Sequence, residues 1–578
     1  MLNIAMVQMN PILGDVVGNI KKTLKFYNQA VQQGADLVVC SEANITGYPL
    51  EDLVRKHDFL YMVRDEVLKI SPLLTEGVGL IIGTPWTIID DQKVYNAAVL
   101  LQKEDMPQFS FKYELPNYGV FDEKRVFTSA DYTDIRPMHF KGYKLGTLIC
   151  EDTWFEKVSK TLKDQGAQIL ISLNGSPFEY AKQNVRYEVV EKRCIETNLD
   201  CVYVNQVGGQ DELIFDGSSF VVTIIQKMYT KYANPDVKLK RMMEDMRVVN
   251  FKDDNGVFRL DRNDVDQILD NTPYPIGPEH EVENYCETTY NALVLSLRDY
   301  YEKSGIFKGV CLGLSGGVDS ALVAAIAADA LGKEKVLTVR LPSKYSSDHS
   351  LSDAADLANR IGVRCKTIDI QQTVDALEFN ESLQNIFKEE GKTEADTTEE
   401  NIQARVRGNF LMSISNKLGY LLLSTGNKSE VSVGYATLYG DMNGGFNVLK
   451  NIYKTDVFSL CEWRNKNIPE LSICLTLDVI PQNIITKPPS AELRPDQKDQ
   501  DSLLPYPRLD AILRCLIDEG KSIAETVDIT GETIDNVVRI RRMISLSEYK
   551  RFQSCPGPKV GHIDFGDDWR FPIINKFW

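Results

Sequence analysis

Three residues of the types that catalyse acyl transfer stand at the ends of expected strands in the first half of the chain. They are Glu42 after Leu37–Cys40, Lys112 after Phe109–Phe111, and Cys150 after Lys144–Ile149. Residues at strand ends can converge at one edge of a sheet, where these three would supply a proton-transfer carboxylate, a cation for the thiolate and oxyanion, and a nucleophile. A lone cysteine at a strand end is most often a small buried residue, so the two charged partners carry this hypothesis.

A second chemical signal is the string Ser315-Gly316-Gly317-Val318-Asp319-Ser320, which lies between an expected strand, Gly309–Leu314, and an expected helix, Ala321–Leu331. Strand, glycine turn and helix N-terminus bring unpaired backbone N–H groups and the positive end of a helix dipole to one point, which suits a phosphate. A carboxylate beside phosphates needs a cation, so Asp319 is predicted to be a magnesium ligand. A plain helix cap is the alternative, and the complete string favours the phosphate loop over it.

Both signals require α/β domains that bring strand ends together. Short apolar runs alternate with helix-like segments through the first part of the chain, at Ile4–Gln8, Leu37–Cys40, Gly79–Gly83, Ala97–Leu101, Leu145–Cys150, Ile169–Leu173 and Cys201–Asn205. A polar, turn-rich stretch over 251–284 reads as a linker, and the alternation of strand and helix resumes after it. We therefore predict one domain over 1–250 and another over 285–578, with a mobile, solvated flap at Lys388–Glu400 in the second.

Composition excludes several classes of protein. The 578 residues, 43% of them hydrophobic, are enough for two large folded domains. A net charge of -17 argues against nucleic-acid and anionic-membrane partners. No segment has the roughly 18 to 20 apolar residues that a membrane span needs. Eleven cysteines without a Cys-x-x-Cys pair, and an N-terminus without a basic region, predict free thiols and a cytoplasmic location.

The strings around the three residues of the first half resemble the Glu-Lys-Cys site of the nitrilase superfamily, in the version found as the glutaminase half of glutamine-dependent NAD synthetases. The strings are Cys40-Ser41-Glu42, residues 112–123, and residues 149–154. The resemblance covers about residues 1–250 and implies a nitrilase-like α/β sandwich in which Glu42, Lys112 and Cys150 are catalytic. It also implies that Tyr118, Ser176 and Lys182 bind glutamine, although the string around Lys182 is less distinctive.

The second half resembles the NAD synthetase members of the N-type ATP pyrophosphatases, through the phosphate loop, Asn401–Asn409, Ser424–Glu430, Tyr439–Gly445, Lys454, 489–501 and 551–572. This implies a doubly wound, Rossmann-like domain. The ATP-binding residues implied are Gly313, Leu314, Ser315, Gly316, Gly317, Val318, Asp319, Ser320 and Thr425. Asn401, Glu430, Asp441 and Lys559 are implied to lie near deamido-NAD, and Glu430 is implied to share Mg²⁺ with Asp319.

Together the resemblances imply an enzyme that amidates deamido-NAD to NAD. ATP would activate the nicotinate carboxylate as an adenylate, and ammonia released from glutamine would displace AMP. Its substrates would be glutamine, ATP and deamido-NAD, and we expect a homo-oligomer. The alternatives are another glutamine-dependent amidotransferase of the same ATP class, a tRNA-modifying or nucleic-acid-binding protein with the same loop, and a non-catalytic nucleotide sensor; the charge and the complete cysteine site argue against the last two.

Overall fold

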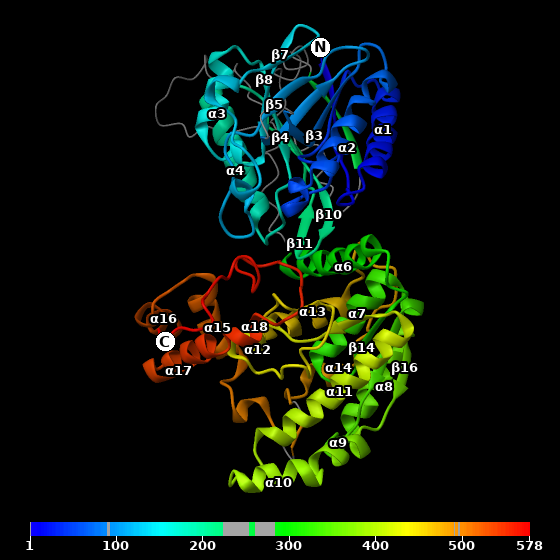
Figure 1. Cartoon of the computed structure of the whole chain (residues 1–578), viewed down its shortest axis with the longest axis vertical. Helices are drawn as coiled ribbons and strands as arrows, with labels where there is room; N and C mark the ends of the chain where they lie inside the picture. Colours follow the sequence, from blue (N-terminus) through cyan, green and yellow to red (C-terminus); the bar gives the residue numbers. More distant parts are fainter. Residues whose placement is uncertain are drawn as a thin grey trace, which may run out of the picture. The chain divides into compact units, whose positions relative to one another are not determined.

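The protein is described by a computed structural model that covers residues 2–88, 93–222, 254–260, 284–490, 492–494 and 497–577, the segment 254–260 by its backbone only. It divides into two compact units, one made of residues 1–210 and 214–283 and the other of residues 211–213 and 284–578 (Figure 1). No helix in these ranges is long and apolar enough to cross a membrane.

The first unit is built on two sheets with the strand orders β13-β1-β2-β3-β4-β5 and β12-β9-β8-β7-β6. Their facing sides form one apolar core that includes Ile4, Ile81, Ile149 and Ile171. The strands are β1 (Leu2–Gln8), β2 (Leu37–Val39), β3 (Gly79–Thr87), β4 (Val94–Leu101), β5 (Gln108–Phe111), β6 (Met138–Phe140), β7 (Tyr143–Ile149), β8 (Ile169–Asn174), β9 (Cys201–Asn205), β12 (Phe220–Val222) and β13 (Asp254–Leu260), with β10 (Val207–Gln210) and β11 (Leu213–Asp216) forming a separate hairpin.

Helices cover the outer faces of both sheets. Helices α1 (Val16–Gln32) and α2 (His57–Leu68) contact β1 and β3, and α3 (Glu156–Asp164) and α4 (Lys182–Thr197) contact β7 and β9. Val158, Leu162 and Val190 of these last two helices pack on Leu170 and Tyr203 of the second sheet. The unit is therefore a helix-sheet-sheet-helix sandwich, and every strand expected from the sequence in this region is present.

Residues 254–260 differ from the sequence prediction, which placed them in the linker. They form β13, which pairs antiparallel with β1 over the register Leu2↔Leu260 to Gln8↔Asp254. The local sequence does not predict this strand, because Asp254, Asn255 and Gly256 are residues typical of turns. The strand forms because it pairs with β1, which lies about 250 residues earlier in the chain. The rest of the predicted linker lies outside the described residues, except for Asn284.

The second unit is a parallel sheet with the strand order β16-β15-β14-β17-β18. Helix α7 (Val318–Leu331) contacts β14 and β15, α8 (Asp348–Ile361) contacts β15 and β16, and α11 (Thr397–Leu418) contacts β14 and β17. Val406 of α11 shares a core with Val339 and Leu422 of the sheet. This confirms the doubly wound fold. The elements of the sheet region are α6 (Tyr285–Ser304), β14 (Val310–Gly313), α7 (Val318–Leu331), β15 (Val336–Arg340), α8 (Asp348–Ile361), β16 (Arg364–Thr367), α9 (Gln371–Glu378), α10 (Glu381–Glu389), α11 (Thr397–Leu418), β17 (Leu421–Ser424) and β18 (Phe446–Asn447).

The strand order places a topological switch point between β14 and β17. From β14 the chain continues through β15 to β16 on one side, whereas β17 and β18 lie on the other side. Ligands of open α/β sheets bind in the crevice that such a reversal leaves at the carboxyl ends of the strands. The loops that follow β14 and β17 therefore meet where a nucleotide site is expected.

A helical cluster near the C-terminus supports the second loop. Helix α12 (Lys428–Val433) packs through Val431 and Val433 against Tyr506, Leu509 and Ile540 of this cluster. The helices of this region are α12, α13 (Lys454–Lys466), α14 (Gln482–Thr486), α15 (Tyr506–Leu513), α16 (Ile523–Thr530), α17 (Ile534–Leu546) and α18 (Glu548–Arg551).

The predicted flap at Lys388–Glu400 is more regular than its composition suggests. Its first residues end α10, and Asp396 begins α11 with a capping box in which Asp396 accepts from the Thr398 N–H and Glu399 accepts from the Asp396 N–H. Most of the segment is exposed, as expected. The capping pair explains the difference, because acidic residues at a helix start satisfy backbone donors without a core.

Candidate active sites

In the first unit, Lys112 joins two buried carboxylates. Its Nζ lies 2.7 Å from Glu42 Oε1 and 2.9 Å from a carboxylate oxygen of Glu123, and all three side chains are almost fully buried. Burial alone would lower the pKa of Lys112, but the carboxylates of Glu123 and Glu42 hold it well above its usual value. The ammonium is therefore a fixed positive charge, as the sequence analysis requires.

Cys150 occupies a strained turn at the end of β7. It is the first residue of a short 3₁₀ helix, Cys150–Thr153, and its φ of 46° lies in the left-handed region that non-glycine residues rarely adopt. Burial and the Glu42 carboxylate raise the pKa of the thiol, whereas Lys112 lowers it. Because its pKa is raised, the thiol needs a proton acceptor when the sulfur attacks, and the buried Glu42 carboxylate is the candidate for that role.

Glu42 itself is oriented by several donors. Asn96 Nδ2 donates to Oε1 at 2.7 Å and the Gly175 N–H donates to Oε2 at 2.8 Å. These bonds come from β4 and from the loop after β8, so both sheets fix the carboxylate. The structure thereby brings Glu42, Lys112 and Cys150 together from three strand ends.

Glu123 is a member of this site that the sequence analysis did not single out. Besides Lys112, it accepts a hydrogen bond from Tyr48 OH at 2.9 Å, and burial raises its pKa to about 7. Glu123 lies in the string 112–123 that carries the resemblance. Its burial depends on how residues after β5 fold back, so residue type alone could not distinguish it from an exposed glutamate.

Asp152 ties the two catalytic segments together. It accepts from the N–H groups of Tyr113 and Glu114, at 3.1 and 2.8 Å, and from the Ile149 N–H at 3.1 Å. The first two donors directly follow Lys112, and the third directly precedes Cys150. One buried carboxylate thus fixes the spacing of the cation and the nucleophile.

The three predicted glutamine-binding residues lie around the turn that holds Cys150. Tyr118 OH donates to Glu151, 3.0 Å from Oε2, and the charge of Lys182 acts on the same carboxylate, whose pKa burial raises. Ser176 directly follows Gly175, the donor to Glu42, and its Oγ accepts from Arg186 Nε at 3.1 Å. A glutamine side chain in reach of Cys150 would thus lie near all three.

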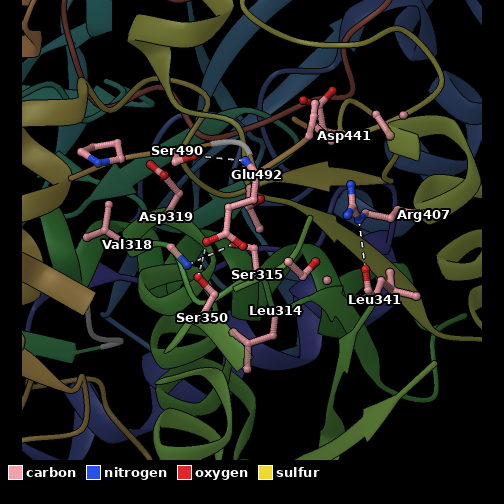
Figure 2. A pocket seen from close by; sticks show the side chains of 18 of the residues that line it. Leu314, Ser315, Val318, Asp319, Leu341, Ser350, Arg407, Asp441, Ser490 and Glu492 are labelled. Carbon is pink, nitrogen blue, oxygen red and sulfur yellow. Dashed lines mark hydrogen bonds between the residues drawn. The ribbon is translucent and has the colours of Figure 1, made fainter. Parts of the chain in front are cut away.

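In the second unit, the phosphate loop borders a cavity of about 290 Å³ (Figure 2). Gly316 has a φ of +81°, and a Cβ there would lie 2.3 Å from the Ser350 carbonyl oxygen, so only glycine fits this turn. Helix α7 begins after Gly317 without a side-chain cap, which leaves its first N–H groups available to an anion. Of the predicted ATP-binding residues, the cavity is lined by Gly313, Leu314, Ser315, Gly317, Val318, Asp319 and Thr425, and Ser320 lines a smaller cavity beside it.

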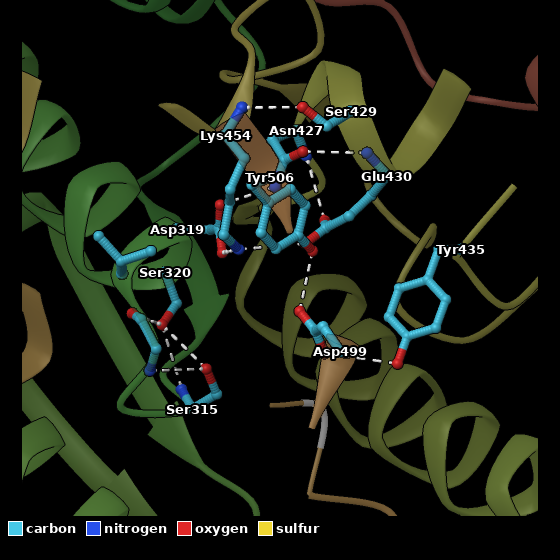
Figure 3. A network of polar contacts seen from close by, with 12 residues as sticks. Ser315, Asp319, Ser320, Asn427, Ser429, Glu430, Tyr435, Lys454, Asp499 and Tyr506 are labelled. Carbon is cyan, nitrogen blue, oxygen red and sulfur yellow. Dashed lines mark hydrogen bonds and ion pairs between the residues drawn. The ribbon is translucent and has the colours of Figure 1, made fainter. Parts of the chain in front are cut away.

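The two predicted magnesium ligands share one ammonium (Figure 3). Lys454 Nζ lies 2.5 Å from Asp319 Oδ2 and 3.2 Å from Glu430 Oε1. Asn427 connects them further, since its Nδ2 donates to Asp319 Oδ1 at 2.8 Å while its Oδ1 accepts from the Glu430 N–H. Two carboxylates with a cation between them, at the edge of a phosphate-binding loop, are a donor set that fits Mg²⁺.

Of the other predicted deamido-NAD residues, Asp441 lines the cavity, and Asn401 is connected to it through Thr437. Asp441 accepts from the Thr437 N–H at 2.6 Å, and Asn401 Oδ1 accepts from Thr437 Oγ1 at 2.8 Å. Lys559 is not brought to either of these cavities. Its Nζ donates to the His562 carbonyl and to Asp568, both at 2.6 Å, within the segment near the C-terminus.

The charged residues Arg407 and Glu492 also line the cavity and were not predicted from the sequence (Figure 2). Arg407 Nε donates to the Leu341 carbonyl at 3.1 Å, and burial lowers the pKa of its guanidinium to about 10. Glu492 accepts from Ser350 Oγ at 2.6 Å and from Ser347 Oγ at 2.9 Å. Both belong to strings that carry the resemblance, but only the fold turns them toward the loop.

Fold and sites together define a carbon-nitrogen hydrolase unit joined to an NAD synthase unit, and family models agree. The carbon-nitrogen hydrolase family matches residues 3–227 and the NAD synthase family matches residues 289–554. A glutamine-dependent NAD(+) synthetase from Rhodobacter capsulatus is 41% identical over 99% of this chain and 98% of its own length. One from Thermotoga maritima is 38% identical over 100% of this chain and 99% of its own.

A solved structure gives the same result. The glutamine-dependent NAD+ synthetase from Acinetobacter baumannii, in complex with adenosine diphosphate, is 37% identical and matches with a TM-score of 0.71 over 99% of this chain and 98% of that chain. The chain belongs to the glutamine-dependent NAD(+) synthetases. It is an enzyme that amidates deamido-NAD with nitrogen from glutamine, and ATP is a substrate.

Proposed function

We propose that the two sites divide the reaction between them, with glutamine hydrolysed at Cys150 and deamido-NAD amidated at the cavity of the second unit. The observation that carries this proposal is the pair of separate, internally complete constellations: Glu42, Lys112 and Cys150 in one unit, and the phosphate loop with Asp319 and Glu430 in the other.

At the first site, Glu42 takes the thiol proton as Cys150 Sγ attacks the side-chain amide carbon of glutamine. Lys112 stabilises the negative charge that develops on the amide oxygen, and the proton passes to the departing nitrogen, which leaves as ammonia. A thioester remains on Cys150. Water, deprotonated by Glu42, then attacks it and releases glutamate. Tyr118, Ser176 and Lys182 hold the amino-acid end of the substrate in this scheme.

At the second site, the loop 313–320 and Thr425 hold the phosphates of ATP, and Asn401, Glu430, Asp441 and Lys559 are assigned to deamido-NAD. The nicotinate carboxylate attacks the α-phosphate, pyrophosphate leaves, and ammonia then displaces AMP from the adenylate. Lys559 is the weakest of these assignments, because its ammonium is engaged away from the cavity.

Mg²⁺ is assigned to Asp319 and Glu430, where it would neutralise the phosphates and polarise the bond to the leaving pyrophosphate. The donor set supports this assignment, since two carboxylates converge there beside the phosphate loop. Asn427 would orient both ligands, through the bonds that it makes to Asp319 and to the helix carrying Glu430.

An isotope experiment tests the division of labour. The full-length protein is given deamido-NAD, ATP, Mg²⁺ and glutamine labelled with ¹⁵N in the side-chain amide. We expect the label in the carboxamide of the NAD formed, with one AMP and one pyrophosphate for each NAD. Label that stays in glutamine while NAD forms, or release of ADP in place of AMP, would contradict the proposal.

We also propose that the protein works in the cytoplasm as a homo-oligomer. All eleven cysteines are free thiols, which suits a reducing compartment. Light scattering after size-exclusion chromatography measures the mass directly, and a single species at the 65.3 kDa of one chain would contradict the oligomer.

A further inference from the structure

The ammonium of Lys454 lies at the oxygens that the proposed Mg²⁺ would use. Its Nζ lies 2.5 Å from Asp319 Oδ2 and 3.2 Å from Glu430 Oε1, and the lysine side chain is only 3% exposed (Figure 3). A magnesium ion binds carboxylate oxygens at about 2.1 Å. An ammonium at hydrogen-bond distance from the same two groups therefore competes with it for lone pairs and repels it.

The backbone of Lys454 is fixed, so only its side chain can change place. Lys454 is the first residue of α13, and its N–H donates to Ser429 Oγ at 2.9 Å. Thr455 is held too, since its N–H donates to Asp510 at 2.9 Å. The side chain above this anchor lines the cavity and passes the ring of Tyr506, whose centroid lies 5.1 Å from Nζ.

A lysine is also unexpected at this place on a helix. The first turn of a helix carries the positive end of the macrodipole, which disfavours a cation. The two carboxylates offset this cost while the site holds no nucleotide. When phosphates enter the cavity, they supply further negative charge. The ammonium then has an alternative partner, to which the side chain can turn while the backbone of Lys454 stays in place.

We propose that Lys454 is an internal counter-ion that occupies Asp319 and Glu430 in the nucleotide-free enzyme, so that the divalent metal binds together with ATP and not before it. This rests on the proposed assignment of Mg²⁺ to these carboxylates. With Lys454 on them, its ammonium offsets part of their negative charge and occupies oxygens that a divalent cation would use. With the lysine turned to the phosphates, both carboxylates are available to the metal.

The test measures metal binding and not activity. Equilibrium dialysis of the full-length protein with Mn²⁺ as the probe, without nucleotide, should show weak binding for the wild type. Lys454→Gln keeps the length of the side chain and removes the charge, and it should bind Mn²⁺ at least tenfold more tightly. Adding Asp319→Asn to Lys454→Gln should return the affinity to the weak value.

Lys428→Gln is the matched control. Lys428 is equally buried in the same unit, and its Nζ pairs with Asp518 at 2.8 Å and touches neither Asp319 nor Glu430. Its replacement should leave Mn²⁺ binding unchanged. Equal gains in Lys428→Gln and Lys454→Gln, or no gain in Lys454→Gln, would overturn the proposal.

Wild-type measurements keep the proposal testable if Lys454→Gln does not fold. With α,β-methylene ATP, an analogue that cannot be split between its α and β phosphates, the wild type should retain Mn²⁺ at least tenfold better than without it, after correction for Mn²⁺ bound by the free analogue. Equal retention with and without the analogue would overturn the counter-ion role. A separate result, normal ammonium-dependent synthesis by Asp319→Asn, would overturn the metal assignment itself.

Discussion

At the scale of single residues, the glutaminase site depends on a buried charge balance. Lys112 faces two carboxylates, Glu42 and Glu123, so one ammonium must compensate two negative charges. Burial makes full ionisation of both costly, and this is why the pKa of Glu123 rises to about 7.

This predicts a pH-dependent stability that Glu123→Gln removes. Between the ordinary pKa of a glutamate, about 4.3, and about 7, the folded protein keeps a proton on Glu123 that the unfolded chain releases. The free energy of unfolding should therefore fall as pH rises through this range, by roughly 3 kcal/mol relative to Glu123→Gln. Denaturant unfolding at several pH values measures the difference. Glu76→Gln, at an exposed turn, is the control; parallel curves for wild type and Glu123→Gln would contradict the prediction.

At the scale of elements, the positions of Lys112 and Cys150 are set by short connections after strands. Asp152 links the segment after β5 to the turn after β7 through three backbone N–H donors. Because the turn at Cys150 is strained, it persists only where such contacts hold it. The same logic applies to Asn427, which links the starts of α7 and α12 in the other unit.

We predict that Asp152→Asn lowers kcat for glutamine hydrolysis about 100-fold while KM changes less than threefold. The amide can still accept from Tyr113 and Glu114, but its NH₂ group would face the Ile149 N–H and displace the turn that carries the nucleophile. Alkylation of Cys150 by iodoacetamide should slow as well.

Thr153→Val is the control for Asp152→Asn. Thr153 lies in the same turn, and its replacement loses a buried hydrogen bond to Ser172, 2.7 Å long, that does not link this turn to the segment after Lys112. It should lose stability but keep kcat. Equal losses of kcat in both variants would show that Asp152 acts only through general stability.

The exposed connection between α10 and α11 gives a second prediction at this scale. Residues 390–396 are exposed and make few contacts beyond the cap at Asp396, so a protease should cut here in the free enzyme. We expect cleavage to slow at least fivefold when ATP and deamido-NAD are both bound, as for a segment that orders over the site. Limited proteolysis followed by mass spectrometry measures this, and equal rates with and without both ligands would contradict it.

At the scale of the whole molecule, each unit contains a complete site for one half-reaction. The proposed catalytic residues 42, 112 and 150 belong to one unit, and the loop 313–320, Thr425, Asp319 and Glu430 belong to the other. Loss of a group in one unit should therefore leave the chemistry of the other intact. The two half-reactions can be assayed separately, by supplying either glutamine or ammonium as the nitrogen source.

We predict opposite outcomes for Cys150→Ala and Asp319→Asn. Cys150→Ala removes the nucleophile, so synthesis from glutamine should fall at least 10³-fold while synthesis from high ammonium stays within threefold of wild type. Asp319→Asn should lower both at least 100-fold, because it acts on the step that follows either nitrogen source. NAD formation from each source measures this. Wild-type use of glutamine by folded Cys150→Ala would remove the glutaminase assignment.

The sequence by itself determined the family of the protein, the groups proposed for its chemistry and the strands that precede them. Glu42, Lys112, Cys150 and the loop 313–320 stand at the ends of apolar runs, and local pattern suffices there because strand ends and glycine turns have short-range signatures. The two α/β units followed from the same alternation of strand and helix, and the doubly wound second sheet was implied by the resemblance of the motifs.

Only the tertiary structure decided which charged residues face one another. Glu123 and Asp152 become part of the first site because chain segments far from Cys150 fold against it, and Lys454 reaches Asp319 across 135 residues of sequence. β13 exists because β1 offers an open edge, and Lys559 turns away because its own segment supplies acceptors. The burial of a side chain and its long-range partners depend on the complete fold, so a local sequence pattern cannot predict them.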